Sequence, residues 1–86
     1  MQFLMKLRVL EQLGKTHRIN ETADALNLRQ PTVTFHMQSL EKEMDTKLFE
    51  QRHGYVGLTD AGTAFLHYAQ EITGLMGEVT VISRNR

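Results

Sequence analysis

Apolar residues recur at helical spacing in the first part of the chain. They are Phe3, Leu7, Leu10 and Leu13, which step by four, three and three. This spacing predicts an amphipathic helix that ends at Gly14, because glycine is common just past a helix end. After a connector at residues 17–19, Asn20 is expected to cap a short second helix, with Glu21 in its first turn and Asn27 at its end.

The helical periodicity resumes behind the only proline, Pro31. Proline suits the first turn of a helix, since an N–H group there has no partner within the helix. The apolar residues that follow step by four, three and four: Val33, Met37, Leu40 and Met44. They predict a third helix with one buried stripe. Only residues 27–30 join it to the second helix, and such a pair is typical of a helix-turn-helix, which offers its second helix to the major groove of DNA.

A β-hairpin is expected next. Two short runs, residues 48–52 and 55–58, are separated by His53 and Gly54, and the glycine supplies a positive φ angle at the turn. A helix-turn-helix followed by a hairpin is a winged helix. The expected fold class is therefore mainly α with a small β-hairpin: a winged helix-turn-helix over residues 1–58, followed by a long linker helix over residues 59–86.

The linker helix is expected to begin at Thr59 as its N-cap and to run to about Ile82. Its apolar stripe is Phe65, Ala69, Ile72, Met76 and Val79, flanked at intervals of seven by Tyr68, Leu75 and Ile82. Such a helix would reach roughly 35 Å, so its far half has no core of its own to pack against. A second copy of the stripe would cover it, which predicts a homodimer. Gly74 and Gly77 lower helix propensity, so an earlier end is the alternative.

The composition excludes several classes of protein. With 86 residues the chain can form one domain with a modest core. It has no cysteine and its four histidines are scattered, so we expect neither a metal site nor a cofactor. No Gly-rich phosphate loop or Ser–His–Asp ordering stands out, and an enzyme is not expected. The first residues do not form a signal peptide, and no apolar run approaches the about 18 residues of a membrane span, so we expect a cytoplasmic protein that does not enter a membrane.

Charge is balanced over the chain but uneven along it. Ten lysine and arginine residues match ten aspartate and glutamate residues, yet no acidic residue lies between Asp24 and Glu41. The residues of this segment that are expected to contact DNA bases or the groove are Gln30, Pro31, Thr32, Thr34, Phe35 and Gln38. His36 and Ser39 offer further hydrogen-bond donors in the same segment. The residues expected to contact phosphates, at the wing and elsewhere, are Lys15, Arg18, Arg29, Arg52 and His53.

Phe35 is the unusual member of this set. Counting about 100° per residue from the apolar stripe, its side chain points away from the core, beside Pro31 and Gln38. A phenylalanine in that position can pack against the methyl group of a thymine in the major groove. The alternative is a singly exposed apolar residue, which is common on protein surfaces.

The chain resembles the LysR-type bacterial transcriptional regulators in two segments, which match the signatures of that family in order and at the same spacing. The segments are TADALNLRQPTVTFHMQSLEKEM and KLFEQRHGYVGLTDAG. The resemblance runs from about Phe3 to Ile72. It implies double-stranded DNA binding by a dimer on an interrupted inverted repeat, with the linker helices pairing two subunits. It also implies a larger C-terminal domain that binds a small-molecule effector, so we expect this chain to be a separated DNA-binding fragment.

The chain departs from the family pattern at three places. Arg29 stands where the family usually has serine, Phe35 where arginine commonly follows serine, and Gln51 where the wing usually carries arginine. These changes affect the expected sequence preference rather than the fold. The alternative function is a winged helix that docks onto another protein. A steep salt dependence of binding to duplex DNA would distinguish the two.

Overall fold

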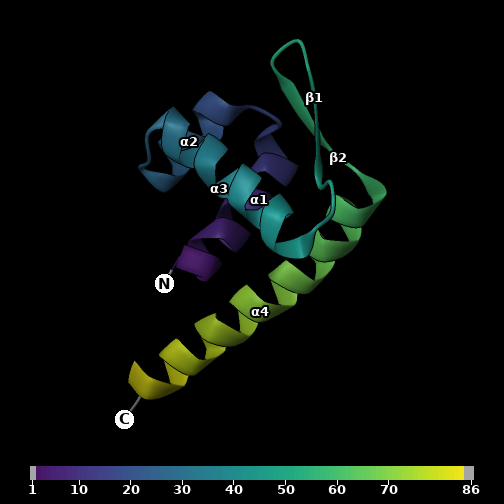
Figure 1. Cartoon of the computed structure of the whole chain (residues 1–86). Helices are drawn as coiled ribbons and strands as arrows, with labels where there is room; N and C mark the ends of the chain where they lie inside the picture. Colours follow the sequence, from purple (N-terminus) through teal and green to yellow (C-terminus); the bar gives the residue numbers. More distant parts are fainter. Residues whose placement is uncertain (1, 85–86) are drawn as a thin grey trace.

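The computed structural model describes residues 2–84, with side chains from residue 3 to residue 75. Its elements are α1 (Gln2–Thr16), α2 (Ile19–Leu26), α3 (Gln30–Met44), β1 (Phe49–Arg52), β2 (Tyr55–Leu58) and α4 (Asp60–Arg84). The first three helices pack together, the hairpin projects from them, and α4 runs past α1 and extends beyond the other helices (Figure 1). This is the expected winged helix-turn-helix followed by a long helix.

The core lies between the three N-terminal helices, the hairpin and the first half of α4. Its buried apolar residues are Leu7, Val9, Leu10, Leu13, Ala23, Val33, Met37, Leu40, Leu48, Phe49, Val56 and Ala69. The predicted apolar stripes of α1 and α3 are thus confirmed, except for one residue at one end of each stripe. Phe3, the first residue of the stripe of α1, is 47% exposed, and Met44, the last residue of the stripe of α3, is 42% exposed.

Two predicted helix ends are wrong. Helix α1 continues through Gly14 to Thr16, and a Cβ atom on Gly14 would lie 3.0 Å from Leu66 Cδ2 of α4. The glycine therefore permits a close approach of two helices instead of ending one. Helix α2 begins at Ile19, with Arg18 as its N-cap and no side-chain cap, so Asn20 is an exposed residue of the first turn.

The wing consists of residues 49–58. Its strands pair antiparallel, with Gln51 opposite Val56 and Arg52 opposite Tyr55. The turn between them has positive φ at both His53 (49°) and Gly54 (81°), as in a type I′ turn, whose twist matches that of the strands.

The start of β1 is held by α3. Glu41 Oε2 accepts hydrogen bonds from the backbone N–H of Leu48 (2.8 Å) and of Phe49 (3.0 Å). A carboxylate accepts hydrogen bonds strongly, so this side chain fixes where the chain leaves α3 and enters the wing.

The start of α4 is held equally firmly. Thr59 is the N-cap, as predicted: its Oγ1 accepts from Gly62 N–H at 3.0 Å and donates to Lys47 O at 2.7 Å. A Cβ atom on Gly62 would lie 2.2 Å from Leu48 O, so only glycine fits between α4 and the residue that precedes β1. Helix α4 then runs to Arg84, two residues beyond the expected end. Among residues 2–84, no helix has the length and apolar character needed to cross a bilayer.

Candidate nucleic-acid interface

One face of α3 is buried and the opposite face carries the predicted base-contacting residues. Val33, Met37 and Leu40 pack into the core. On the outer side, the structure leaves Gln30, Pro31, Phe35 and Gln38 exposed, with Thr32 and Thr34 half-buried. Phe35 is 57% exposed, so its predicted direction is correct. The outer face of α3 therefore presents amide, hydroxyl and aromatic groups from a rigid helix.

Further groups line the same face of α3. Thr34 Oγ1 donates to Gln30 O at 3.3 Å, which commits the hydroxyl hydrogen to the helix and leaves the oxygen lone pairs as acceptors. Phe35, Gln38, Ser39 and Lys42 surround an open hollow of about 320 Å³. An exposed aromatic ring beside an amide and an ammonium group can contact the edge of a base pair and an adjacent phosphate.

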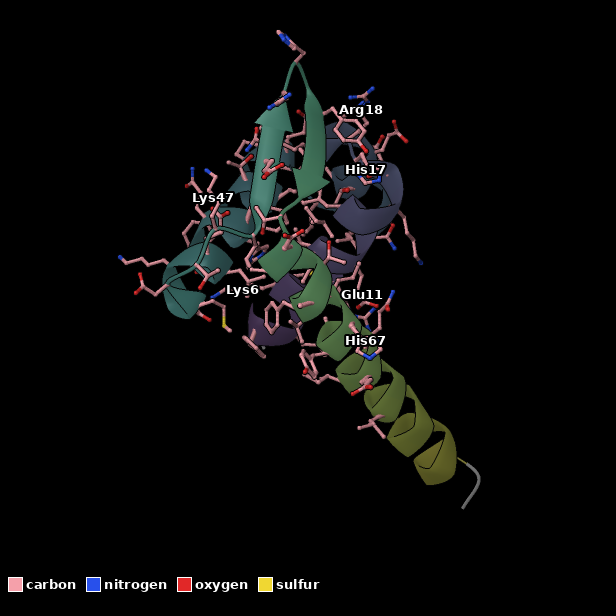
Figure 2. The ribbon with its side chains drawn as sticks, turned by 90° about the vertical axis from the view of Figure 1, so that its right-hand side faces the viewer. Lys6, Glu11, His17, Arg18, Lys47 and His67 are labelled. Atoms are coloured by element: carbon pink, nitrogen blue, oxygen red, sulfur yellow. The ribbon has the colours of Figure 1, made fainter. Side chains whose placement is uncertain are left out.

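The predicted phosphate-contacting residues are all exposed and come from three places. Lys15 and Arg18 flank the turn between α1 and α2, Arg29 is the N-cap of α3, and Arg52 and His53 lie at the tip of the wing. Figure 2 shows Arg18 beside the wing, where its Cζ atom lies 5.5 Å from the centre of the Tyr55 ring. The structure thus brings Arg18 next to the wing, a proximity that the sequence did not indicate.

His36 is not part of the outer face, contrary to its inclusion among the donors of the third helix. It is only 7% exposed, and its Nδ1 atom has no hydrogen-bond partner among the described residues. Burial, and secondly the positive charge of Lys6, lower the pKa of His36 below its ordinary value of 6.5. Lys6 is itself buried and pairs with Glu43. His36 therefore contributes to the contact between α1 and α3.

The predicted dimer stripe on α4 is divided by the fold. Ala69 is completely buried in the chain's own core, so it has no surface to offer a partner and its assignment to a dimer interface is wrong. Phe65 is half-buried against the same core, whereas Ile72 is exposed. The side chains of Met76 and Val79 lie outside the described residues.

An apolar groove runs beside this stripe. It has a volume of about 410 Å³ and is lined by Met44, Thr46, Leu48, Ala61, Ala64, Phe65 and Tyr68. Tyr68, Ile72 and Leu75 continue it as exposed large side chains along α4. A groove of this kind on a small protein is typical of an interaction site.

His17 is a residue whose role the sequence did not reveal. Its ring nitrogen bonds to the wing backbone 39 residues away, and its ring stacks on Tyr55. Scattered histidines gave no signal for this contact, because the partner atom is a backbone carbonyl. Among the described residues, no group of three histidine or acidic side chains is placed to hold a metal ion.

Comparisons with known proteins agree on one family. The family model described as bacterial regulatory helix-turn-helix protein, lysR family, matches residues 4–63. The HTH-type transcriptional regulator CitR of Bacillus subtilis is 49% identical over 56 residues, covering 65% of this chain and 19% of CitR. A probable RuBisCO transcriptional regulator of Gracilaria tenuistipitata is 35% identical over 75 residues, covering 87% of this chain and 24% of the relative.

A similar chain has been solved in complex with DNA. The structure described as the CbnR_DBD–DNA complex superposes with a TM-score of 0.88 at 32% sequence identity, covering 95% of this chain and 94% of that one. The present chain spans about a fifth to a quarter of the length of the curated relatives it matches.

Proposed function

The chain belongs to the lysR family of bacterial regulatory helix-turn-helix proteins, and from this we propose that it binds double-stranded DNA in a sequence-specific manner as part of a transcriptional regulator. The observation that carries the proposal is the outer face of α3, which is exposed, contains no acidic residue from Arg29 to Leu40, and stands on a helix whose other face is buried. Residues 1–58 would form the DNA-binding domain and residues 59–86 the linker.

Each group of residues has a distinct role in this proposal. Gln30, Thr32, Thr34 and Gln38 hydrogen-bond to base edges in the major groove, while Pro31 and Phe35 make apolar contacts there. Lys15, Arg18 and Arg29 contact phosphates, which fixes the register of the protein on the duplex without reading its sequence. Arg52 and His53 at the wing tip contact the neighbouring phosphates or the minor groove.

The salt dependence of binding tests this function. Each neutralised phosphate releases counterions, so the four lysine and arginine contacts of each chain predict a slope of roughly −3.6 when the logarithm of the binding constant is plotted against the logarithm of the salt concentration. Replacing Lys15, Arg18, Arg29 or Arg52 by alanine should each reduce that slope by about one unit. Arg8→Ala is the control, because Arg8 is exposed on α1 but is not a proposed contact. A slope near zero would contradict DNA binding and favour a winged helix that docks onto protein.

We further propose that the chain acts as a homodimer through α4, on an interrupted inverted repeat. The apolar groove beside Phe65 and the exposed Tyr68, Ile72 and Leu75 support this, since a second α4 would cover them. Ile72, together with Met76 and Val79, forms the proposed seam, and Phe65 contributes its exposed part. The α3 helices of the two subunits would then enter major grooves on one side of the duplex.

Sedimentation equilibrium at tens of micromolar tests the dimer. The double substitution Ile72→Lys and Met76→Lys places two charges in the seam, which should cost several kcal/mol and convert the dimer to a monomer. Gln70→Lys is the control, because Gln70 is an exposed polar residue of the same helix. A monomeric unsubstituted chain, or a dimer that persists in the double variant, would show that the seam is assigned incorrectly.

We also propose that a small-molecule effector acts on this domain through a further domain of a longer regulator, and that the regulator works in the cytoplasm. The greater length of the curated relatives supports the first proposal. Footprinting on the DNA upstream of the operon that encodes the chain, with and without candidate effectors, would test both the target and the regulation.

A further inference from the structure

His17 lies in the turn between α1 and α2, beside the wing (Figure 2). Its φ angle is +58°, in the left-handed region, which is uncommon for residues other than glycine although asparagine, aspartate and histidine are enriched there. The backbone N–H of His17 donates to Leu13 O at 2.9 Å, which closes the end of α1. A strained conformation is retained where surrounding contacts determine it, so the contacts of the side chain need an explanation.

Those contacts are with Val56 of β2. In the wing, Arg52 and Tyr55 flank the two-residue turn and form a hydrogen-bonded pair, so the next pair, Gln51 and Val56, is not hydrogen-bonded across the strands. The backbone N–H and C=O of Val56 therefore point outward, from the free edge of β2. Such unpaired edge groups require partners when they are covered by protein.

His17 satisfies both edge groups of Val56. The N–H of Val56 donates to His17 O at 2.9 Å, and Nδ1 of His17 lies 2.9 Å from Val56 O. Since a carbonyl oxygen only accepts, Nδ1 carries the hydrogen and donates it. His17 thus pairs with the edge of β2 as a residue of a third strand would. With its left-handed φ angle, both the carbonyl and the ring of His17 reach the same strand.

An aromatic stack adds to this pairing. The His17 ring stacks on the Tyr55 ring, with centroids 4.7 Å apart and an angle of 12° between their planes. The guanidinium of Arg18 also lies over Tyr55, at 5.5 Å from the ring centre. Tyr55 pairs across the hairpin with Arg52. The exposed Tyr55 ring therefore links the α1–α2 turn, including Arg18, to the strand pair that carries Arg52.

We propose that His17 is a positioning residue for DNA binding, which fixes the wing against the α1–α2 turn so that Arg52 keeps a constant place relative to α3. The inference rests on the proposed DNA-binding function. A two-stranded hairpin is marginally stable alone and depends on its packing for a defined orientation. The side chains of Phe49 and Val56 anchor the wing to the core, and His17 holds its free edge.

Hydrogen exchange of the wing tests the attachment directly, with or without DNA. His17→Gly permits the same φ angle and keeps the backbone carbonyl that accepts from Val56, but it removes the ring and its hydrogen bond. The Val56 amide should then exchange roughly ten times faster, while amides of α1 such as that of Leu10 keep their rates. Tyr55→Phe, which retains the stacked ring, is the matched control and should leave exchange unchanged.

Binding to duplex DNA tests the positioning role. His17→Gly should weaken binding about three- to ten-fold on specific and non-specific duplexes alike and reduce the salt slope by about one unit, as loss of a phosphate contact would. If His17 acts by placing Arg52, then His17→Gly should cause no further loss in a chain that already carries Arg52→Ala.

The outcomes separate the two proposals. Unchanged Val56 exchange in His17→Gly, or losses from His17→Gly and Arg52→Ala that simply add, would overturn the role of His17 while leaving DNA binding intact. An unsubstituted chain that binds no duplex DNA would overturn the proposed function itself, and with it the positioning role. Faster Val56 exchange together with a non-additive loss of DNA affinity supports both.

Discussion

Replacing Phe35 by alanine removes an aromatic ring that contributes little to folding and that DNA recognition is expected to use. The ring stands on the outer face of α3 and meets the ring of His36 edge-on, with centroids 5.8 Å apart. In the proposed complex it packs against the methyl group of a thymine. We therefore expect Phe35→Ala to weaken binding to the preferred operator much more than it destabilises the folded chain.

The expected magnitudes follow from the exposed fraction of Phe35. Full burial of a phenylalanine side chain stabilises by about 1.5–3 kcal/mol. Since 57% of the residue is exposed, the part already covered contributes roughly 0.6–1.3 kcal/mol to folding, and alanine recovers some of this through its higher helix propensity. Covering the exposed part in the groove would contribute roughly 0.9–1.7 kcal/mol. This corresponds to about a four- to sixteen-fold loss of affinity in Phe35→Ala.

The assay isolates the methyl group. An operator is first selected from a random duplex pool with the unsubstituted chain, and each thymine of a half-site is then replaced by deoxyuridine, which lacks only the methyl group. Fluorescence anisotropy measures the affinity of both proteins for both duplexes. At the thymine that Phe35 contacts, the phenylalanine side chain and the methyl group should show a coupling energy, so Phe35→Ala should lose little on the deoxyuridine duplex.

Two results would refute this reasoning. A fall in melting temperature well beyond that expected from about 1 kcal/mol would place Phe35 in the core. Equal weakening on the thymine duplex and on every deoxyuridine duplex would remove the methyl contact. Phe3→Ala serves as the control, because Phe3 is similarly exposed but lies on α1, and it should leave the affinity for DNA unchanged.

Further predictions concern stability. Gly62→Ala should destabilise the fold by at least about 2 kcal/mol and lower the melting temperature by roughly 8 °C or more, because its Cβ would lie 2.2 Å from Leu48 O. Gly74→Ala is the control: Gly74 stands in open space, so the substitution should stabilise by about 0.5–1 kcal/mol. Equal effects of the two substitutions would contradict the close contact at Gly62. Burial and the charge of Lys6 lower the pKa of His36 below 6.5, so the unfolded chain binds protons more readily than the folded one. The free energy of unfolding, measured in urea, should therefore fall as the pH drops below about 6.5 and through the lowered pKa, and His36→Gln should reduce that fall; an unchanged pH dependence would count against the buried histidine.

Local sequence patterns predict much of the fold, because the features concerned depend on residues that are close together in the chain. The stripe that contains Val33, Met37 and Leu40 is determined by helical geometry alone, and it also placed Phe35 correctly on the outside. Pro31 and Thr59 are helix-start residues whose effect is confined to one turn. Such features are set within four residues along the chain, so the sequence is sufficient to place them.

The features that were missed depend on contacts between distant segments. Gly14 looked like a helix end, but it lies against Leu66 of α4, and that neighbour cannot be identified from the residues around the glycine. Ala69 fits the periodicity of a dimer stripe, yet the chain's own core covers it. His17 hydrogen-bonds to a backbone atom of Val56, and any residue at position 56 would supply the same carbonyl. Periodicity shows that a face is apolar, but not which surface covers it.

The junction between the wing and α4 has a mechanical consequence. Leu48 O leaves no room for a side chain at Gly62, and Thr59 bonds to both Lys47 and Gly62, so α4 is held closely against the segment that leads into β1. A helix of 25 residues acts as a lever of about 37 Å, and a tilt of roughly 5° at its base would displace its far end by about 3 Å. In the proposed dimer, a rigid junction at the start of each α4 would keep the distance between the two α3 helices nearly constant. A change in half-site spacing would then have to be absorbed by bending of the DNA or by the distal part of α4.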